Sequence, residues 1–460
     1  MRKKLMTRRN FLARGGQAAL GAGFAASLLA GCGGQESSRT PLVYWSEIEG
    51  KEAQDYYREN VQRPFQQANE DIDFEVKFVA DVDRVVRTAL QGGSGPDLVP
   101  TLGPAFALEY VKANLFRELN EYAEQYGWQD KMLGWALDLG RFEGGLYSVP
   151  TRFETMLLYY NKSVFEERGW SVPANREELE AVAEEASGRG IIPFAAGNEE
   201  YTTSTEWFVT MFWNHFSGPE ALYQGLTGEI PWTDPVFVDA IDLLNQYFQR
   251  GWFGGSVQQF FTTAPNEWYA QLGNGEAAMD MDGYWVASTI NDYFGEAGGN
   301  DNEWGWSSLP PLRDDIPQSL YELAIGATLS INERTEQPDA AAEYIDWYFS
   351  DPKRIAQRMA DVPAWFNIAA PVEESDFPSD IDPRVEQIIS ALSEATNRGN
   401  FGYATWTFWP PETDVFIIEE LETVLVGNMT PAEYCAGVND HFQKEREEGL
   451  VPPAIRPGTS

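Results

Sequence analysis

Strand patterns and helix patterns alternate along the first quarter of the sequence, after a basic and apolar start. Residues 41–47 (PLVYWSE) predict a buried strand, and residues 72–80 alternate apolar and polar side chains strictly, as a half-buried strand does. A helical pattern over 50–68 separates these strands. A second helical pattern over 82–90 ends at two glycines and precedes a short strand within 96–103. This alternation is typical of a mostly parallel, doubly wound sheet, and we therefore predict an α/β fold.

The N-terminal segment has the composition of an export signal. It carries six basic residues and no acid before Glu36, and an apolar stretch covers residues 18–30. That stretch is shorter than the roughly 20 apolar residues of a membrane-spanning helix. The adjacent Arg8 and Arg9 resemble a twin-arginine signal, which exports proteins that have already folded. We therefore predict that this segment is cleaved on export.

A lipid attachment site follows the apolar stretch. Residues 29–32 (LAGC) resemble a bacterial lipobox, which implies a signal peptide over 1–31 and a lipid on the thiol of Cys32. Several acyl chains on one residue would hold the chain at the extracellular face of the membrane. Residues 32–40 then form a short flexible tether. The alternative is a transmembrane anchor with an incidental cysteine.

The charge of the mature chain excludes several classes of partner. Without residues 1–31 the chain carries 27 basic residues and 71 acids, a net charge of −44. Nucleic acid phosphates and anionic lipid headgroups would repel such a chain, so we expect no nucleic acid partner. The acids could serve a cationic ligand. They are spread along the whole chain, however, which favours a solvated surface adapted to high salt, where screening removes self-repulsion.

Cysteine and histidine are too scarce for most metal or redox sites. Cys435 has no partner once Cys32 carries lipid, so a disulfide framework and a cysteine-based zinc site are excluded. Only His215 and His441 could supply imidazole ligands. The sequence also lacks a Gly-x-Ser-x-Gly elbow and a phosphate-binding loop. We expect no cofactor and no metal.

Tryptophan is abundant in segments that predict loops. The chain has 16 tryptophans, and several stand beside Gly, Pro, Asp or Thr. Aromatic rings in polar loops suit sugars, because a pyranose offers C–H groups on its faces and hydroxyls on its rim, and a stacked contact is worth on the order of 1 kcal/mol beyond its area. The tryptophans in such positions are Trp207, Trp232, Trp252, Trp285, Trp304, Trp365, Trp406 and Trp409.

Four segments in order resemble one known family. Residues 144–170 place Gly-x-Tyr-x-x-Pro before Leu-Tyr-Tyr-Asn-Lys, and residues 272–285 end in Gly-x-Trp. Residues 304–312 (WGWSSLPPL) and 325–352 follow. Together they are similar to the extracellular solute-binding proteins of ABC importers, the maltose-binding-protein-like class (family 1). The sequence departs from the family pattern at 363–371 (PAWFNIAAP).

The resemblance implies a fold and partners. It implies two doubly wound α/β lobes joined by hinge strands, as in type II periplasmic binding proteins, with the ligand between the lobes and closure by a hinge motion. We expect residues 41–151 and 313–362 in the N-terminal lobe, and residues 152–312 and 363–456 in the C-terminal lobe. The partners implied are two permease subunits with their ATPase, and we expect a monomer.

Candidate ligand residues lie where strands end and where the lobes meet. In open α/β sheets the carboxyl ends of strands line the binding crevice. An arginine fork and a carboxylate can each bind neighbouring hydroxyls of a sugar. The alternative to ligand binding is a structural role for these residues, in the core of a strand, in a salt bridge inside the hinge or in a packed aromatic corner. The candidates are Trp45, Glu47, Arg152, Glu154, Trp207, Asp282, Tyr284, Trp285, Trp365, Phe366, Tyr403 and Trp406.

The function we predict is capture of a sugar, a di- or oligosaccharide, without catalysis. Specificity would come from hydrogen bonds to hydroxyls and from aromatic platforms. An alternative is a secreted glycoside hydrolase, which needs only two carboxylates; Asp280 and Asp282 would face the same side of a strand. A further alternative is a binding protein for a peptide or a polyamine.

Overall fold

The computed structural model describes residues 39–80 and 82–458, which form one compact unit. The predicted signal peptide, the lipidation of Cys32 and most of the predicted tether lie outside these residues. Of the helices within the described ranges, none is long and apolar enough to cross a membrane.

The first sheet contains the strands that the N-terminal pattern predicts. Its order is β12-β11-β3-β1-β2, and β6 also pairs with β11. β1 runs parallel to β2 and to β3, whereas β11 runs antiparallel to β3 and β6. Its strands are β1 (Thr40–Ser46), β2 (Ile72–Phe78), β3 (Leu98–Thr101), β6 (Val149–Glu154), β11 (Tyr321–Ile331) and β12 (Phe401–Tyr403).

The second sheet has the order β10-β7-β9-β8. β7 runs antiparallel to both of its neighbours, and only β8 and β9 are parallel. The α/β class is therefore confirmed, but the sheets are mixed rather than mostly parallel. The antiparallel pairs involve the strands on either side of the connections between the sheets: β7 pairs with β9 and β10, and β11 pairs with β3 and β6. The strands are β7 (Met156–Asn161), β8 (Ile192–Ala195), β9 (Ala277–Gly283) and β10 (Trp304–Ser307).

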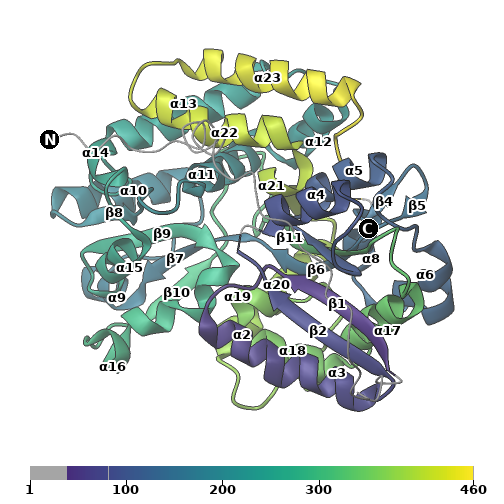
Figure 1. Cartoon of the computed structure of the whole chain (residues 1–460). Helices are drawn as coiled ribbons and strands as arrows, with labels where there is room; N and C mark the ends of the chain where they lie inside the picture. The colour runs from purple at the N-terminus through teal and green to yellow at the C-terminus, as the bar shows by residue number, and fades with distance from the viewer. Residues whose placement is uncertain (1–38, 81, 459–460) are drawn as a thin grey trace, which may run out of the picture. The chain divides into compact units, whose positions relative to one another are not determined.

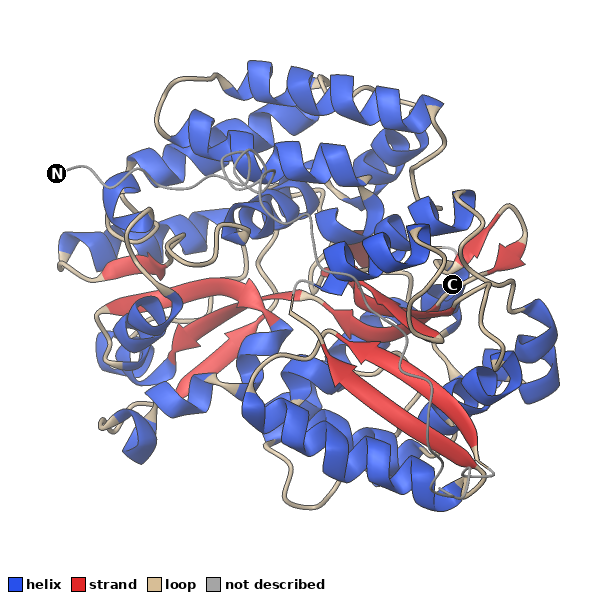
Figure 2. Ribbon diagram, in the orientation of Figure 1, coloured by secondary structure: helices blue, strands red, loops and turns tan. Residues whose placement is uncertain are grey.

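Helices flank both sheets, as Figures 1 and 2 show. The helices before β7 are α2 (Lys51–Tyr57), η1 (Arg58–Gln62), α3 (Arg63–Ala68), α4 (Val82–Gln91), α5 (Pro104–Lys112), α6 (Asn120–Tyr126), α7 (Trp128–Lys131) and α8 (Gly134–Asp138). A small hairpin, β4 (Arg141–Phe142) and β5 (Gly145–Leu146), follows α8.

The helices between β7 and β10 mostly accompany the second sheet; for example, α10 packs on β8 and α15 on β9. They are α9 (Lys162–Arg168), α10 (Arg176–Gly188), α11 (Ser204–Phe212), η2 (Trp213–Ser217), α12 (Pro219–Thr227), α13 (Pro235–Gln249), α14 (Val257–Phe260), α15 (Pro265–Gly273), η3 (Tyr284–Ser288), η4 (Ile290–Tyr293) and α16 (Gly295–Gly298). The helices after β11 are α17 (Pro338–Phe349), α18 (Pro352–Asp361), α19 (Pro363–Phe366), η5 (Glu374–Asp376), α20 (Pro383–Asn397), α21 (Thr405–Phe408), α22 (Pro411–Leu425) and α23 (Pro431–Glu447).

The chain passes between the sheets at two short connections. The first is Thr155, the single residue between β6 and β7, and the second is the segment 308–320 between β10 and β11. The resemblance implied hinge strands, and a third crossing was expected at residues 362–363. In the structure these residues join helices α18 and α19 and do not form a strand, because the Asp351 carboxylate caps α18 and a proline stands in the first turn of each helix. The crossing itself stays a prediction.

The expected lobe boundaries depart from the sheets at two strands. Residues 152–154 of β6 were assigned to the C-terminal lobe, yet they pair with β11 of the first sheet. Residues 363–456 were assigned to the C-terminal lobe, yet β12 pairs in parallel with β11 of the first sheet, with Phe401 opposite Tyr321. The reason is that α20 returns the chain to the edge of β11. With these two exceptions noted, the boundaries 41–151 plus 313–362 and 152–312 plus 363–456 remain a proposal.

Several tryptophans that border predicted loops belong to the core. Trp213, Trp232 and Trp409 pack ring on ring, with centroids 5.0–5.6 Å apart. Trp252 and Trp304 are buried as well. A turn residue beside a tryptophan therefore indicates where the backbone bends, but it does not say whether the indole ring faces solvent.

Candidate functional site

An ion pair marks the end of β6, where the chain leaves the first sheet. Arg152 Nε donates to Glu154 Oε1 at 2.8 Å, and Arg152 Nη2 donates to the carbonyl of Gly326 on β11, also at 2.8 Å. Both side chains are about one-tenth exposed, 12% and 11%. The β6–β11 register is irregular around residues 325–328. A Cβ on Gly326 would lie 2.3 Å from the Glu154 carboxylate, so glycine is required for this contact.

A small cavity lies beside this ion pair. Its wall includes Glu47, Arg152 and Trp365, together with a group of tyrosines. The guanidinium of Arg152 lies 5.2 Å from the ring centroid of Trp365, and Tyr44 donates to the Glu47 carboxylate at 3.1 Å. The cavity volume is about 20 Å³, which is room for roughly one water molecule. The tyrosines that line it are Tyr44, Tyr57, Tyr344 and Tyr348.

Four aromatic side chains form a continuous row, which we call the aromatic row. Tyr201 packs on Trp207 and Trp207 packs on Trp285, each with ring centroids 5.2 Å apart, and Trp285 packs on Trp406 at 6.1 Å. Tyr201 is 47% exposed, whereas Trp207 is 5% exposed. Trp285 and Trp406 are half-buried. The buried Trp207 therefore supports the Tyr201 and Trp285 rings, and Trp285 in turn contacts Trp406; these three rings retain exposed surface.

The position of Trp285 follows from the local sequence. β9 ends at Gly283, and a Cβ on this glycine would lie 2.2 Å from the Trp285 indole, so the ring folds back over the glycine backbone. Gly283 pairs with Met156, the first residue of β7 after the crossing. The turn η3, which contains Trp285, also packs against α19, which contains Trp365. The aromatic row and the cavity are thus joined through η3 and α19.

A buried pair of acids lies behind the aromatic row. Glu206 precedes Trp207, and its carboxylate accepts a hydrogen bond from Thr405 Oγ1 at 3.2 Å. Burial, and then the neighbouring Asp414, raise the pKa of Glu206 well above its usual range. Burial raises the pKa of Asp414 to about 7, and the charge of Glu445 acts in the same direction. This pair therefore holds a proton in the folded chain at neutral pH.

The two carboxylates considered for catalysis lie inside the second sheet. Asp280 and Asp282 are 2% and 1% exposed. Asp282 accepts hydrogen bonds from Tyr269 at 2.8 Å and from the Gly283 amide at 2.6 Å, and burial raises its pKa to about 7. Burial and the neighbouring Asp282 raise the pKa of Asp280 well above its usual range. Neither carboxylate presents an accessible surface to a substrate.

The structure brings together seven of the candidate residues. Glu47, Arg152, Glu154 and Trp365 gather at the cavity, whereas Trp207, Trp285 and Trp406 belong to the aromatic row.

The other candidates point elsewhere. Trp45 is half-buried against the cluster that contains Val82 and Val86. Phe366 is buried against Tyr56 and Tyr57. The remaining three are in the interior: Asp282, Tyr284 and Tyr403 are 1%, 1% and 0% exposed, and the hydroxyl of Tyr403 donates to the carbonyl of Ile455.

Tyr201 and Gly326 are not among the ligand residues that the sequence patterns predict. Tyr201 is a lone aromatic residue in a polar stretch (NEEYTTSTE, residues 198–206), and that isolation is a signal that could have identified it. Gly326 stands inside an apolar strand pattern, where a glycine indicates a close approach of another group. The group that approaches, Glu154, is distant in the sequence.

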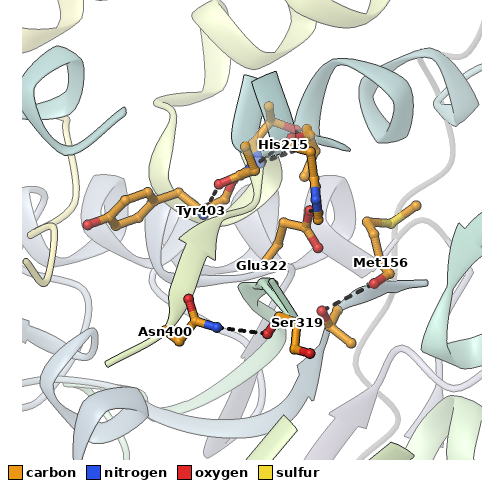
Figure 3. Close-up of polar contacts among 10 residues, drawn as sticks. Met156, His215, Ser319, Glu322, Asn400 and Tyr403 are labelled. Atoms are coloured by element: carbon orange, nitrogen blue, oxygen red, sulfur yellow. Dashed lines mark hydrogen bonds and ion pairs between the residues drawn. The ribbon is translucent and has the colours of Figure 1, made fainter. Parts of the chain in front are cut away.

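Polar contacts join the helical turn η2 to β11 and β12, the strands that follow the connection at residues 308–320 (Figure 3). His215 Nε2 lies 3.1 Å from Glu322 Oε1 on β11, and both side chains are buried. The Tyr403 amide donates to Asn214 Oδ1 at 2.8 Å. Asn214 and His215 lie in η2, a π-helical turn, and such turns occur frequently at functional sites. These contacts tie η2 to β11 and β12.

Solved structures of other proteins share this fold. A chitin oligosaccharide binding protein aligns with 88% of this chain and 99% of its own, at a TM-score of 0.74 and 19% identity. A structure from a study of xylan utilization by a thermophilic Caldanaerobius bacterium aligns with 87% of this chain and 100% of its own, at a TM-score of 0.73 and 18% identity. The fold is that of the type II periplasmic binding proteins.

The family follows from the sequence match. The model of the bacterial extracellular solute-binding proteins matches residues 48–354, and the chain belongs to that family. The resemblance inferred from the four segments is therefore confirmed.

Curated relatives are distant. The chain is 22% identical to a maltotriose-binding protein of Pyrococcus abyssi over 70% of its own length and 65% of the relative. It is 26% identical to a multiple sugar-binding protein of Streptococcus mutans over 39% of its own length and 43% of the relative. It is 23% identical to an uncharacterized ABC transporter extracellular-binding protein of Pyrococcus horikoshii over 57% and 56%. The match thus spans less than two thirds of each of these relatives.

Proposed function

We propose that this protein captures a neutral di- or oligosaccharide outside the cell and delivers it to an ABC importer. The observation that carries the proposal is the aromatic row of Tyr201, Trp207, Trp285 and Trp406, joined through η3 and α19 to the Arg152–Glu154 pair.

The chemistry of this site suits a sugar. Exposed indole and phenol faces stack on the C–H faces of pyranose rings. The Arg152 guanidinium and the carboxylates of Glu47 and Glu154 supply charged hydrogen bonds to hydroxyls, each worth about 1.5–3 kcal/mol. The names of the relatives, which refer to maltotriose, multiple sugars and chitin oligosaccharides, agree with this ligand class.

We propose that the protein binds its ligand without converting it. The sugar would bind between the two lobes, near the connections between the sheets at Thr155 and 308–320. The lobes would close over it by a hinge motion at these connections. Its partners would be two permease subunits with their ATPase, and the protein would act as a monomer. The buried positions of Asp280 and Asp282 support binding over glycoside hydrolysis.

We also propose that the mature chain begins at Cys32 and is held to the membrane by lipid on that residue. Replacing Cys32 with Ser should release the protein into the medium, and replacing Cys435, which is buried, should leave it with the membrane. If the Cys32→Ser variant and the wild type were found with the membrane in equal proportion, anchoring through Cys32 would be wrong. The proposal of sugar binding would not be affected.

Tryptophan fluorescence with a panel of solutes tests the function. We expect a saturable change with at least one neutral di- or oligosaccharide, a raised melting temperature at the same concentrations, and recovery of the sugar intact by mass spectrometry. Cleavage of the sugar would establish an enzyme. Saturable binding of a peptide or a polyamine, with no response to any sugar, would show that the ligand belongs to that class and is not a sugar.

A further inference from the structure

A second hollow lies on the outer edge of the second sheet. Its volume is about 520 Å³, within the usual range for small-molecule sites. Strand β10 is at the edge of this sheet, and α20 and the η4–α16 segment complete the wall. We call it the edge groove; the lining residues that matter here are Tyr160, Asn291, Trp304, Trp306, Arg384 and Gln387.

The edge groove is separate from the proposed sugar site. On β7, Met156 pairs with Gly283 beside Trp285, whereas Tyr160 pairs with Met279. Four residues of strand separate these positions, roughly 13 Å at about 3.3 Å per residue. Among the described residues that line the edge groove, none belongs to the aromatic row or to the cavity at Arg152.

The floor of the edge groove is shaped by a glycine. Gly305 on β10 pairs with Tyr160 on β7, and a Cβ on Gly305 would lie 2.3 Å from the Tyr160 ring. The half-buried ring therefore lies across the backbone of β10 instead of standing away from the sheet. Trp306, on the same strand as Gly305, is also half-buried. Tyr160 and Trp306 both line the hollow and are half-buried, and the alternation along β10 places them on opposite faces of this edge of the sheet.

One wall of the edge groove is held in place by a network of contacts. The Arg384 guanidinium stacks on Trp304 at 3.8 Å and pairs with Asp382 at 2.6 Å. Asn291 Oδ1 accepts hydrogen bonds from Trp304 Nε1 at 2.8 Å and from Arg384 Nη2 at 3.1 Å. Exposed polar groups are therefore presented from a rigid surface before any ligand arrives, which lowers the entropy cost of binding.

Charge in the edge groove is balanced locally. Lys162 pairs with Glu303 at 2.8 Å, and Arg384 pairs with Asp382. A charged ligand would have to compete with these pairs. A neutral molecule with flat apolar faces and a rim of hydroxyls would not, and it could contact the half-buried ring of Tyr160 or Trp306 together with the exposed amide of Gln387.

We propose that the edge groove is a second carbohydrate-binding site, which holds a segment of a neutral oligosaccharide outside the main site. Such a site would keep a long glycan on the protein while another part of it, or another molecule, occupies the main site.

Isothermal titration calorimetry of the full chain with maltohexaose, xylohexaose and chitohexaose tests this proposal. We expect two binding events with at least one hexasaccharide. In the Trp285→Ala/Trp406→Ala variant the binding event at the edge groove, which we call the groove event, should remain. In Trp306→Ala it should weaken about five- to tenfold, as expected for the loss of one stacked ring. Trp347→Ala, which removes a half-buried indole from α17, should leave both events intact.

The outcomes separate the two sites. A groove event that also weakens in Gln387→Ala, an exposed position that should not affect folding, supports the proposal. A single event with every hexasaccharide, or a second event of unchanged affinity in both Trp306→Ala and Gln387→Ala, would overturn it. Failure of the main-site proposal would appear differently, as binding that is unchanged in Trp285→Ala/Trp406→Ala.

Discussion

Gly326 and Glu154 approach each other so closely that no side chain fits between them: a Cβ on Gly326 would lie 2.3 Å from the carboxylate of Glu154. The same glycine accepts a hydrogen bond from Arg152 through its carbonyl. One backbone position on β11 therefore holds both members of the ion pair that we place in the sugar site.

The first prediction concerns this contact. In Gly326→Ala the methyl group should displace the Glu154 carboxylate and break its 2.8 Å bond with Arg152. We expect sugar affinity to fall about tenfold or more, since a charged hydrogen bond is worth about 1.5–3 kcal/mol. Gly134→Ala is the matched control, because a Cβ there meets nothing within 4 Å. Equal calorimetric affinities for the two variants would rule out a role for the ion pair in binding.

The second prediction separates tryptophans of the site from tryptophans of the core. Trp285→Ala should weaken sugar binding by about tenfold, or about 1.4 kcal/mol, and change stability little, because the ring is half-buried. Trp232→Ala removes a fully buried ring stacked on Trp213, and it should lower the free energy of unfolding by about 3–5 kcal/mol. Calorimetry and thermal melting check both; a reversed pattern would contradict the assignment of Trp285.

The third prediction concerns pH. Burial raises the pKa of Asp414 from its ordinary 3.8 to about 7, so between these values the folded chain keeps a proton that the unfolded chain loses. This contribution to stability is fully present below about pH 4 and is lost as the pH rises toward 7. The melting temperature of the wild type should therefore fall between pH 5 and pH 8 by about 2 °C or more beyond any fall in Asp414→Asn.

A control for the pH experiment is Asp440→Asn, which removes the same charge from an exposed position. The melting temperature of this variant should change with pH as that of the wild type does. If Asp414→Asn and Asp440→Asn showed the same dependence on pH, the protonated acid pair behind the aromatic row would lose its support.

The fourth prediction concerns salt. The chain carries 71 acids and 33 basic residues, a net charge of −38. Raising KCl from 0.1 M to 1 M shortens the screening length from about 10 Å to about 3 Å, which should weaken self-repulsion and raise the melting temperature. Sucrose at equal osmolality separates screening from solvent exclusion. A melting temperature that stays constant or falls in KCl would contradict a salt-adapted surface.

Much of the fold could be predicted from local patterns. The strict alternation over residues 72–80 corresponds to β2, which has a buried face and an exposed face, and the run from Pro41 corresponds to β1. The direction of β7 could not be predicted in this way. Its pairing depends on the crossing at Thr155 and on partners more than 100 residues away.

The site was harder to predict than the fold. Trp365 and Phe366 are neighbours in α19, yet one lines the cavity and the other is buried against Tyr56, because adjacent residues of a helix point about 100° apart. Glu47 and Arg152 meet only through the tertiary fold. A sequence pattern can therefore select the segments that reach the site, but it does not select which residue of each segment faces the ligand.

We propose above all that the aromatic row and the Arg152–Glu154 pair hold one neutral sugar. A crystal structure of the chain with a saccharide that raises its melting temperature would test this binding site. We predict a pyranose ring against the Trp285 indole, with a hydroxyl within hydrogen-bond distance of the Arg152 guanidinium or the Glu154 carboxylate. A saccharide bound elsewhere, with no contact to Trp285 or Arg152, would show that these residues do not form the sugar site.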